Sequence, residues 1–222
     1  MEPSTDLGWG RPAWTFLHGL TLDPTSGTKE KVAQKQVLKL LMTLLPCPTC
    51  RVSYQTYCSN TLGPCSLEDL GNYVCRIHDK VNLKLEKDTC NKDAEYWKTV
   101  QAKHFQDAQW SDESFGEDMF YFLFAIVSNY PKKWGGVRLP RKYVEFFTVL
   151  VSALGHRKVG QCMQRYLESH PLEECNRLAN RHHLTTWLYE MYQHCRDSLE
   201  QVVPLKTIVA TMESIRKISA KK

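Results

Sequence analysis

The run Cys47-Pro48-Thr49-Cys50 has the residue types and spacing that most directly indicate chemistry in this sequence. Pro48 suits the first turn of a helix, so the pair should stand at a helix N-terminus. Free backbone N–H groups and the positive end of the helix dipole lower the pKa of a thiol placed there. A C-x-x-C pair can be a redox dithiol, part of a zinc site or a chance pairing, and its spacing leaves these alternatives open.

A second pair, Cys75 and His78, lies three residues apart in a segment with helical periodicity. Together with Cys47 and Cys50 it forms a Cys3His set, which zinc accepts as ligands. The distance between the two pairs is longer than in common zinc modules but does not exclude them. A zinc-binding scaffold or interaction protein without enzymatic activity is therefore the alternative to a redox enzyme.

The chain has 9 cysteines. The acidic N-terminal residues lack the basic region of a signal peptide, so we expect a compartment where structural disulfides are disfavoured. Cys58 and Cys65 can pair, relay electrons or stay reduced. Cys162 and Cys175 can pair, which would leave Cys195 alone.

Further motifs surround these cysteines. A Gly-Arg-x-x-Trp-x-x-Leu-His run ends at His18, a proline precedes Cys47, and a Cys-x-x-His-Asp-x-Val-Asn-x-Lys-Leu-x-Lys run begins at Cys75. Cys90 and Trp97 follow. In combination these motifs resemble the Erv/ALR family of FAD-linked sulfhydryl oxidases over about residues 8–100. The sequence departs from the family pattern in having Asp79 for Asn, Tyr73 for Trp, a shorter route to Cys90 and no second C-x-x-C motif.

The resemblance implies a bound FAD. Flat apolar side chains would form walls for its rings, polar side chains would hydrogen-bond adenine or ribose, and cations would hold its pyrophosphate. A core histidine, core aromatics and a solvated charge run are the plain alternatives for the same residues. The positions that the resemblance assigns to the cofactor are Gly10, Arg11, Trp14, His18, Cys75, His78, Asp79, Val81, Asn82, Lys84, Lys87 and Trp97.

The resemblance also implies a reaction in which protein thiols become disulfides and O2 becomes H2O2. A substrate thiolate would attack Cys47, and Cys50 would pass the electrons on to FAD. The substrate would be a protein thiol, with a thioredoxin-fold carrier as one candidate. Cys75 would form a structural disulfide with Cys90, and a bonded Cys75 would not be available to zinc.

Helical periodicity dominates, and no stretch shows sustained strand alternation, so the predicted class is all-α. We expect a four-helix flavin-binding bundle in residues 1–105 and a second helical bundle in residues 106–222. Capping signals favour helix starts near Ser66, Ser114 and Pro140. The expected helices are 12–22, 28–45, 47–58, 66–87, 117–129, 140–154, 156–168, 171–181, 183–200 and 204–218.

The two halves share a pattern of apolar helices. Trp14 and His18 correspond to Phe120 and Phe124, each 106 residues later in the sequence. The region of the dithiol corresponds to 155–158, and His78 corresponds to Tyr192. We therefore expect the second half to be a degenerate copy without cofactor, which packs on the first as an intramolecular pseudo-dimer. An unrelated helical interaction module, with a homodimer formed by the first half, is the alternative.

Net charge is +5, with basic and acidic residues interspersed, which does not indicate a nucleic-acid surface. The longest apolar run, Met119 to Val127, is too short to cross a bilayer. We expect a protein without nucleic-acid or membrane partners. Its resemblance to compact viral-type family members indicates host cytoplasm or a virion, with the mitochondrial intermembrane space as the alternative.

Overall fold

The computed structural model describes residues 8–89, 112–132, 138–173 and 176–198. Within them the chain is helical and contains no strand, which confirms the predicted all-α class. The helices are α1 (Gly10–Thr21), α2 (Thr28–Leu44), α3 (Pro48–Cys58), α4 (Leu70–Lys84), α6 (Asp112–Ser128), α7 (Arg138–Ala153), α8 (Lys158–Ser169) and α9 (Arg181–Ser198).

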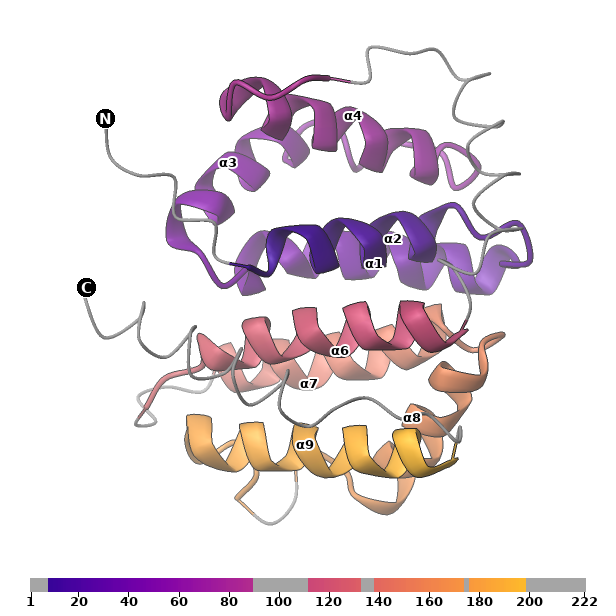
Figure 1. The fold of residues 1–222 in the computed structure, drawn as a ribbon, viewed down its shortest axis with the longest axis vertical. Helices are drawn as coiled ribbons and strands as arrows, with labels where there is room; N and C mark the ends of the chain where they lie inside the picture. Colours follow the sequence, from indigo (N-terminus) through magenta and orange to yellow (C-terminus); the bar gives the residue numbers. More distant parts are fainter. Residues whose placement is uncertain (1–7, 90–111, 133–137, 174–175, 199–222) are drawn as a thin grey trace.

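The helices stack along the long axis of the molecule, with α1–α4 at one end and α6–α9 at the other (Figure 1). Helix α1 packs on α6, and α2 packs on α7, so these four helices form the contact between the two halves. Inside the first half α1 packs on α4, and α2 packs on α3. The second half repeats this arrangement, with α6 on α9 and α7 on α8.

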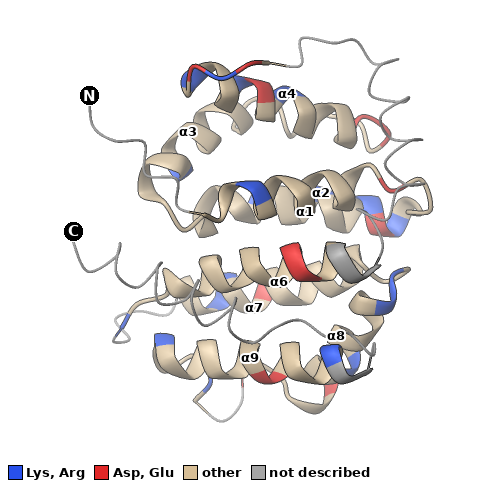
Figure 2. Cartoon of the chain, in the orientation of Figure 1, with Lys and Arg blue, Asp and Glu red and all other residues tan. Residues whose placement is uncertain are grey.

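One apolar core extends through both halves. The run from Met119 to Val127 on α6 is buried except for Tyr121, which is partly exposed, because α6 lies between α1 on one side and α9 on the other. An apolar stretch too short to cross a membrane is thus a central helix of the core. None of the described helices is long and apolar enough to span a membrane. Figure 2 shows charged residues of both signs distributed over the helices.

Gly71 sets how closely α4 approaches the C-terminal end of α1. A Cβ atom at this position would lie 2.2 Å from Leu22 Cδ2 and 3.2 Å from the carbonyl oxygen of Thr21. A larger residue would push α4 away from α1. The two helices that carry most of the expected cofactor residues therefore meet through a glycine.

Several helix boundaries differ from the prediction. A helix over 171–181 is wrong: the described residues of this segment form turns, and Asn176 has a φ of 57°, which a right-handed helix does not accommodate. Ser66 does not begin α4, since Ser66 and Asp69 form a turn and the helix starts at Leu70. Ser114 lies inside α6. The expected helix 204–218 falls outside the described residues.

Candidate functional site

Cys47 and Cys50 stand at the start of α3, as predicted. Cys47 is the N-cap residue, Pro48 opens the helix, and the Cys47 sulfur accepts a hydrogen bond from the Cys50 backbone N–H at 3.1 Å. The two cysteines are joined in a disulfide, with Cα atoms 5.1 Å apart. Both side chains are partly exposed. The disulfide is accessible, and a helix N–H points at the Cys47 sulfur. Once the bond is reduced, this N–H favours the thiolate form of Cys47.

The backbone that leads into this disulfide is held by Arg51, which sequence reasoning missed. Leu45 has an extended conformation after α2 ends, and its carbonyl oxygen accepts a hydrogen bond from Arg51 Nη1 at 2.5 Å. A cation in the first turn of a helix is disfavoured by the helix dipole. The guanidinium of Arg51 instead folds back to a carbonyl that precedes the helix.

Four of the expected cofactor residues meet between α1 and α4. The rings of Trp14 and His78 stack in parallel, with centroids 4.0 Å apart and 9° between their planes. His18 Nε2 lies 3.0 Å from His78 Nδ1, and His18 Nδ1 lies 3.7 Å from the sulfur of Cys75. A flat, nitrogen-rich aromatic surface is thus built from both helices.

Burial lowers the pKa of His78, and the charge of Lys87 acts in the same direction. The nearby carboxylate of Asp79 opposes this shift without outweighing it. His78 is therefore neutral at pH 7, and one of its ring nitrogens donates a hydrogen bond while the other accepts one. In this state the ring can stack on a flat aromatic group without carrying a charge into the helix interface.

The C-terminal end of α4 carries the expected polar residues beside the start of α3. Lys84 Nζ lies 2.5 Å from the hydroxyl oxygen of Ser53 on α3, one turn after Cys50. Asn82 donates a side-chain hydrogen bond to the carbonyl of Asp88 at 3.3 Å, and Val81 is half-buried. Lys87 is exposed. The dithiol and the lysine-rich end of α4 therefore lie on neighbouring helix ends.

The remaining expected residues are less closely connected to this cluster. Gly10 opens α1, and Arg11 is exposed close to the carboxylate of Asp118 on α6. Trp97 and Cys90 lie outside the described residues, so the disulfide between Cys75 and Cys90 stays a prediction.

The Cys3His set of the zinc alternative does not converge. Within the described part of the chain, no three His, Cys, Asp or Glu side chains are arranged to hold a metal ion. Cys47 and Cys50 are bonded to each other, and Cys75 lies against His18. This geometry favours a redox pair at Cys47 and Cys50 over a shared zinc site.

The structure has Cys58 and Cys65 as thiols rather than as a disulfide. Burial raises the pKa of Cys58, although hydrogen bonds with the hydroxyls of Tyr73 and Tyr54 oppose the shift. Cys195 is a thiol, and a hydrogen bond with Cys162 raises its pKa. Cys175, the expected partner of Cys162, lies outside the described residues.

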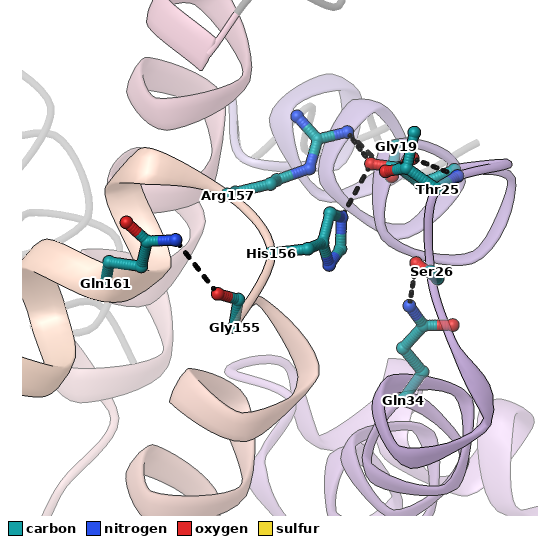
Figure 3. A network of polar contacts seen from close by, with 9 residues as sticks. Gly19, Thr25, Ser26, Gln34, Gly155, His156, Arg157 and Gln161 are labelled. Carbon is teal, nitrogen blue, oxygen red and sulfur yellow. Dashed lines mark hydrogen bonds and ion pairs between the residues drawn. The ribbon is translucent and has the colours of Figure 1, made fainter.

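A buried ion pair between the halves was also missed by sequence reasoning. Asp23, after α1, lies 2.7 Å from Arg157 Nη2 and 2.8 Å from His156 Nε2, both in the turn between α7 and α8. Figure 3 shows His156 and Arg157 pointing from this turn toward Gly19 and Thr25. Burial alone would raise the pKa of Asp23, but hydrogen bonds from His156 and Thr25 and the charge of Arg157 hold it well below its ordinary value.

Comparison with known proteins finds similarity in the first half of the chain. The sequence model of the Erv1 / Alr family matches residues 11–110, so this segment is similar to that family. The resemblance noted from the motifs is confirmed over this segment.

Two curated relatives match the same part of the chain. The mitochondrial FAD-linked sulfhydryl oxidase ERV1 of Saccharomyces cerevisiae is 35% identical over 94 residues, which cover 40% of this chain and 50% of the relative. The FAD-linked sulfhydryl oxidase ERV1 of Arabidopsis thaliana is 35% identical over 91 residues, or 38% of this chain and 46% of the relative. The chain thus spans about half the length of the curated relatives it matches. No solved structure matches the chain.

Proposed function

We propose that this chain is an FAD-linked sulfhydryl oxidase, which forms disulfides in protein thiols and reduces O2 to H2O2. One observation carries the proposal: a Cys47–Cys50 disulfide at the N-terminus of α3, in a segment similar to the Erv1/Alr family. The parallel rings of Trp14 and His78 add an aromatic surface on the helices beside it.

The dithiol performs the exchange chemistry. A substrate thiolate attacks the Cys47 sulfur, the Cys47–Cys50 bond breaks, and Cys50 leaves as a thiolate. A second substrate thiolate then attacks the mixed disulfide and releases the oxidised substrate together with a Cys47 thiolate. The Cys50 N–H, 3.1 Å from the Cys47 sulfur, stabilises that thiolate. Two electrons and two protons per substrate disulfide remain with the enzyme and its cofactor.

The residues between α1 and α4 fit FAD. Trp14 and His78 offer flat faces, the nitrogens of His18 and His78 offer hydrogen bonds, and the cationic groups of Lys84 and Lys87 suit a pyrophosphate. The other residues of the proposed set are Gly10, Arg11, Cys75, Asp79, Val81, Asn82 and Trp97. When bound, FAD supplies the two-electron acceptor that oxidises the dithiol and passes the electrons to O2.

Cys50→Ala should keep FAD and lose thiol oxidation, because the proposed cofactor residues are elsewhere while electron transfer from the dithiol needs Cys50. The flavin absorption band and the rate of thiol loss measure the two properties separately. Cys65→Ser is the matched control, since this half-buried thiol in the loop before α4 is outside the dithiol. A colourless, zinc-loaded protein, or oxidation near the wild-type rate in Cys50→Ala, would refute the proposal.

We also propose the class of substrate and the cellular location of the protein. Protein thiols, delivered by a thioredoxin-fold carrier or by the client protein itself, are the proposed substrates. Host cytoplasm or a virion is the proposed location; a relative named as mitochondrial favours the intermembrane space as the alternative.

We also propose that the second half is a degenerate copy of the first. The packing of α6–α9 repeats that of α1–α4, and corresponding helices pack on each other across the contact between halves, as in a two-fold dimer. Phe124 and Tyr192 occupy the positions that correspond to His18 and His78. One FAD per full-length chain is expected, and two would refute this proposal.

A further inference from the structure

The second half contacts the redox turn of the first half through Asn129. Asn129 follows α6, and its side-chain amide lies between two groups of the turn. With the amide nitrogen toward the turn, it donates to the carbonyl oxygen of Pro46 at 3.2 Å, and its oxygen accepts from Arg51 Nη1 at 2.7 Å. Pro46 immediately precedes Cys47, so one side chain binds the backbone before the disulfide and the guanidinium just after it.

The opposite contact has the same form with the halves exchanged. Asp23 follows α1 in the first half and binds His156 and Arg157 in the turn between α7 and α8. That turn corresponds to the dithiol turn between α2 and α3. Arg157 also donates to the carbonyl oxygen of Gly19 at 3.3 Å (Figure 3). Its guanidinium lies 4.1 Å from the ring centroid of Phe115.

Asp23 and Asn129 are themselves corresponding residues. They are 106 positions apart, the separation that also relates Trp14 to Phe120 and His18 to Phe124. Each half thus uses a residue within two positions of the end of its first helix to bind the other half's turn between the second and third helices. Equivalent contacts of this kind are what a two-fold arrangement requires.

We propose that Asn129 is a positioning residue for the Cys47–Cys50 pair. It fixes the Pro46 carbonyl and the Arg51 guanidinium, and thereby the N-cap conformation in which the Cys47 sulfur accepts the Cys50 N–H. This conformation stabilises the Cys47 thiolate and hence the reduced pair. The second half therefore tunes the redox equilibrium of a dithiol to which it contributes no cysteine. The inference rests on the proposed function, in which this dithiol is the redox centre.

The test compares Asn129→Ala with the wild type as full-length chains. Each is equilibrated anaerobically in glutathione buffers, the thiols are trapped, and the ratio of disulfide to dithiol at Cys47–Cys50 is read by mass spectrometry. The pKa of Cys47 comes from the pH dependence of its alkylation rate. Asn180→Ala is the matched control: it removes an asparagine whose side-chain oxygen accepts a hydrogen bond from the His183 N–H, a contact made within the second half.

We expect Asn129→Ala to raise the disulfide-to-dithiol ratio at least threefold and to raise the pKa of Cys47, while Asn180→Ala changes neither. Asn129→Asp keeps the acceptor for Arg51 but loses the donor to Pro46. Asn129→Asp should raise the disulfide-to-dithiol ratio by less than Asn129→Ala does. It provides the test if the alanine variant does not fold.

An unchanged or lowered ratio in the Asn129 variants, or an equal rise in Asn180→Ala, would overturn the inference. Flavin content and thiol oxidation, measured on the same samples, test the proposed function separately. If the protein binds flavin and oxidises thiols but Asn129→Ala leaves the disulfide-to-dithiol ratio unchanged, only the role of Asn129 is rejected. If the ratio shifts in a protein that holds no flavin, only the proposed oxidase function is rejected.

Discussion

Replacing Asp23 by Asn should destabilise the whole protein, because it removes the counter-charge of a buried guanidinium. Arg157 is 6% exposed, and Asp23 is 7% exposed. Breaking a buried ion pair by neutralising one partner costs about 3–5 kcal/mol. We expect about 3 kcal/mol here, at the lower end of this range, since the amide oxygen still accepts hydrogen bonds from Arg157 and His156.

Urea unfolding of the full chain measures this loss, and a loss of that size should lower Tm by roughly 6–12 °C for a chain of this length. The matched control is Asp69→Asn, which neutralises an exposed pair with Arg76 at 2.6 Å and should cost at most about 1 kcal/mol. The double variant Asp23→Asn with Arg157→Met should recover part of the loss, because it leaves no unpaired charge. Equal losses for Asp23→Asn and Asp69→Asn would refute the reasoning.

Three further predictions concern the same helices. The pKa of Asp23 is lowered in the folded state, so its contribution to the free energy of unfolding is fully present above its unfolded pKa near 4 and is lost as pH falls toward the folded value. When stability is measured against pH, the wild type should therefore converge on Asp23→Asn below about pH 4. Gly71→Ala should cost about 1–3 kcal/mol in urea unfolding, because its Cβ would overlap Leu22, whereas Gly63→Ala, with no atom within 4 Å of its Cβ, should cost far less. Trp14→Leu should weaken FAD binding up to about tenfold through the loss of aromatic stacking, as measured by flavin retention on dilution, with the Cys47–Cys50 disulfide still formed.

Features that depend on neighbouring residues were predictable from the sequence. Pro48 predicts a helix that begins at the dithiol, and the structure has it there. The predicted starts at Ser66 and Ser114 failed because both residues match a capping pattern, while tertiary packing decides where the helix forms. Pro171 similarly suggested a helix where the chain makes turns.

Contacts between distant residues had no local signal. Asp23 and Arg157 are separated by more than a hundred residues, and each is an ordinary charged residue in its own segment. The correspondence of the two halves was the one indication available, since the 106-residue separation also links Asp23 to Asn129. Applied to polar loop residues as well as to aromatic ones, it would have related Asp23 to Asn129, but the residues that each of them contacts are known only from the structure.

The joining of both halves in one chain has a consequence for how the contact between α1, α2, α6 and α7 can change. In a homodimer, a substitution at a two-fold interface occurs twice, so both sites change together, and the association weakens on dilution. Here each position occurs once, and the halves stay together at any concentration. One end of the contact can therefore hold a charged pair, Asp23 with Arg157, while the other holds a neutral amide beside Arg51. A single gene can adjust the surroundings of the dithiol without disturbing the opposite end.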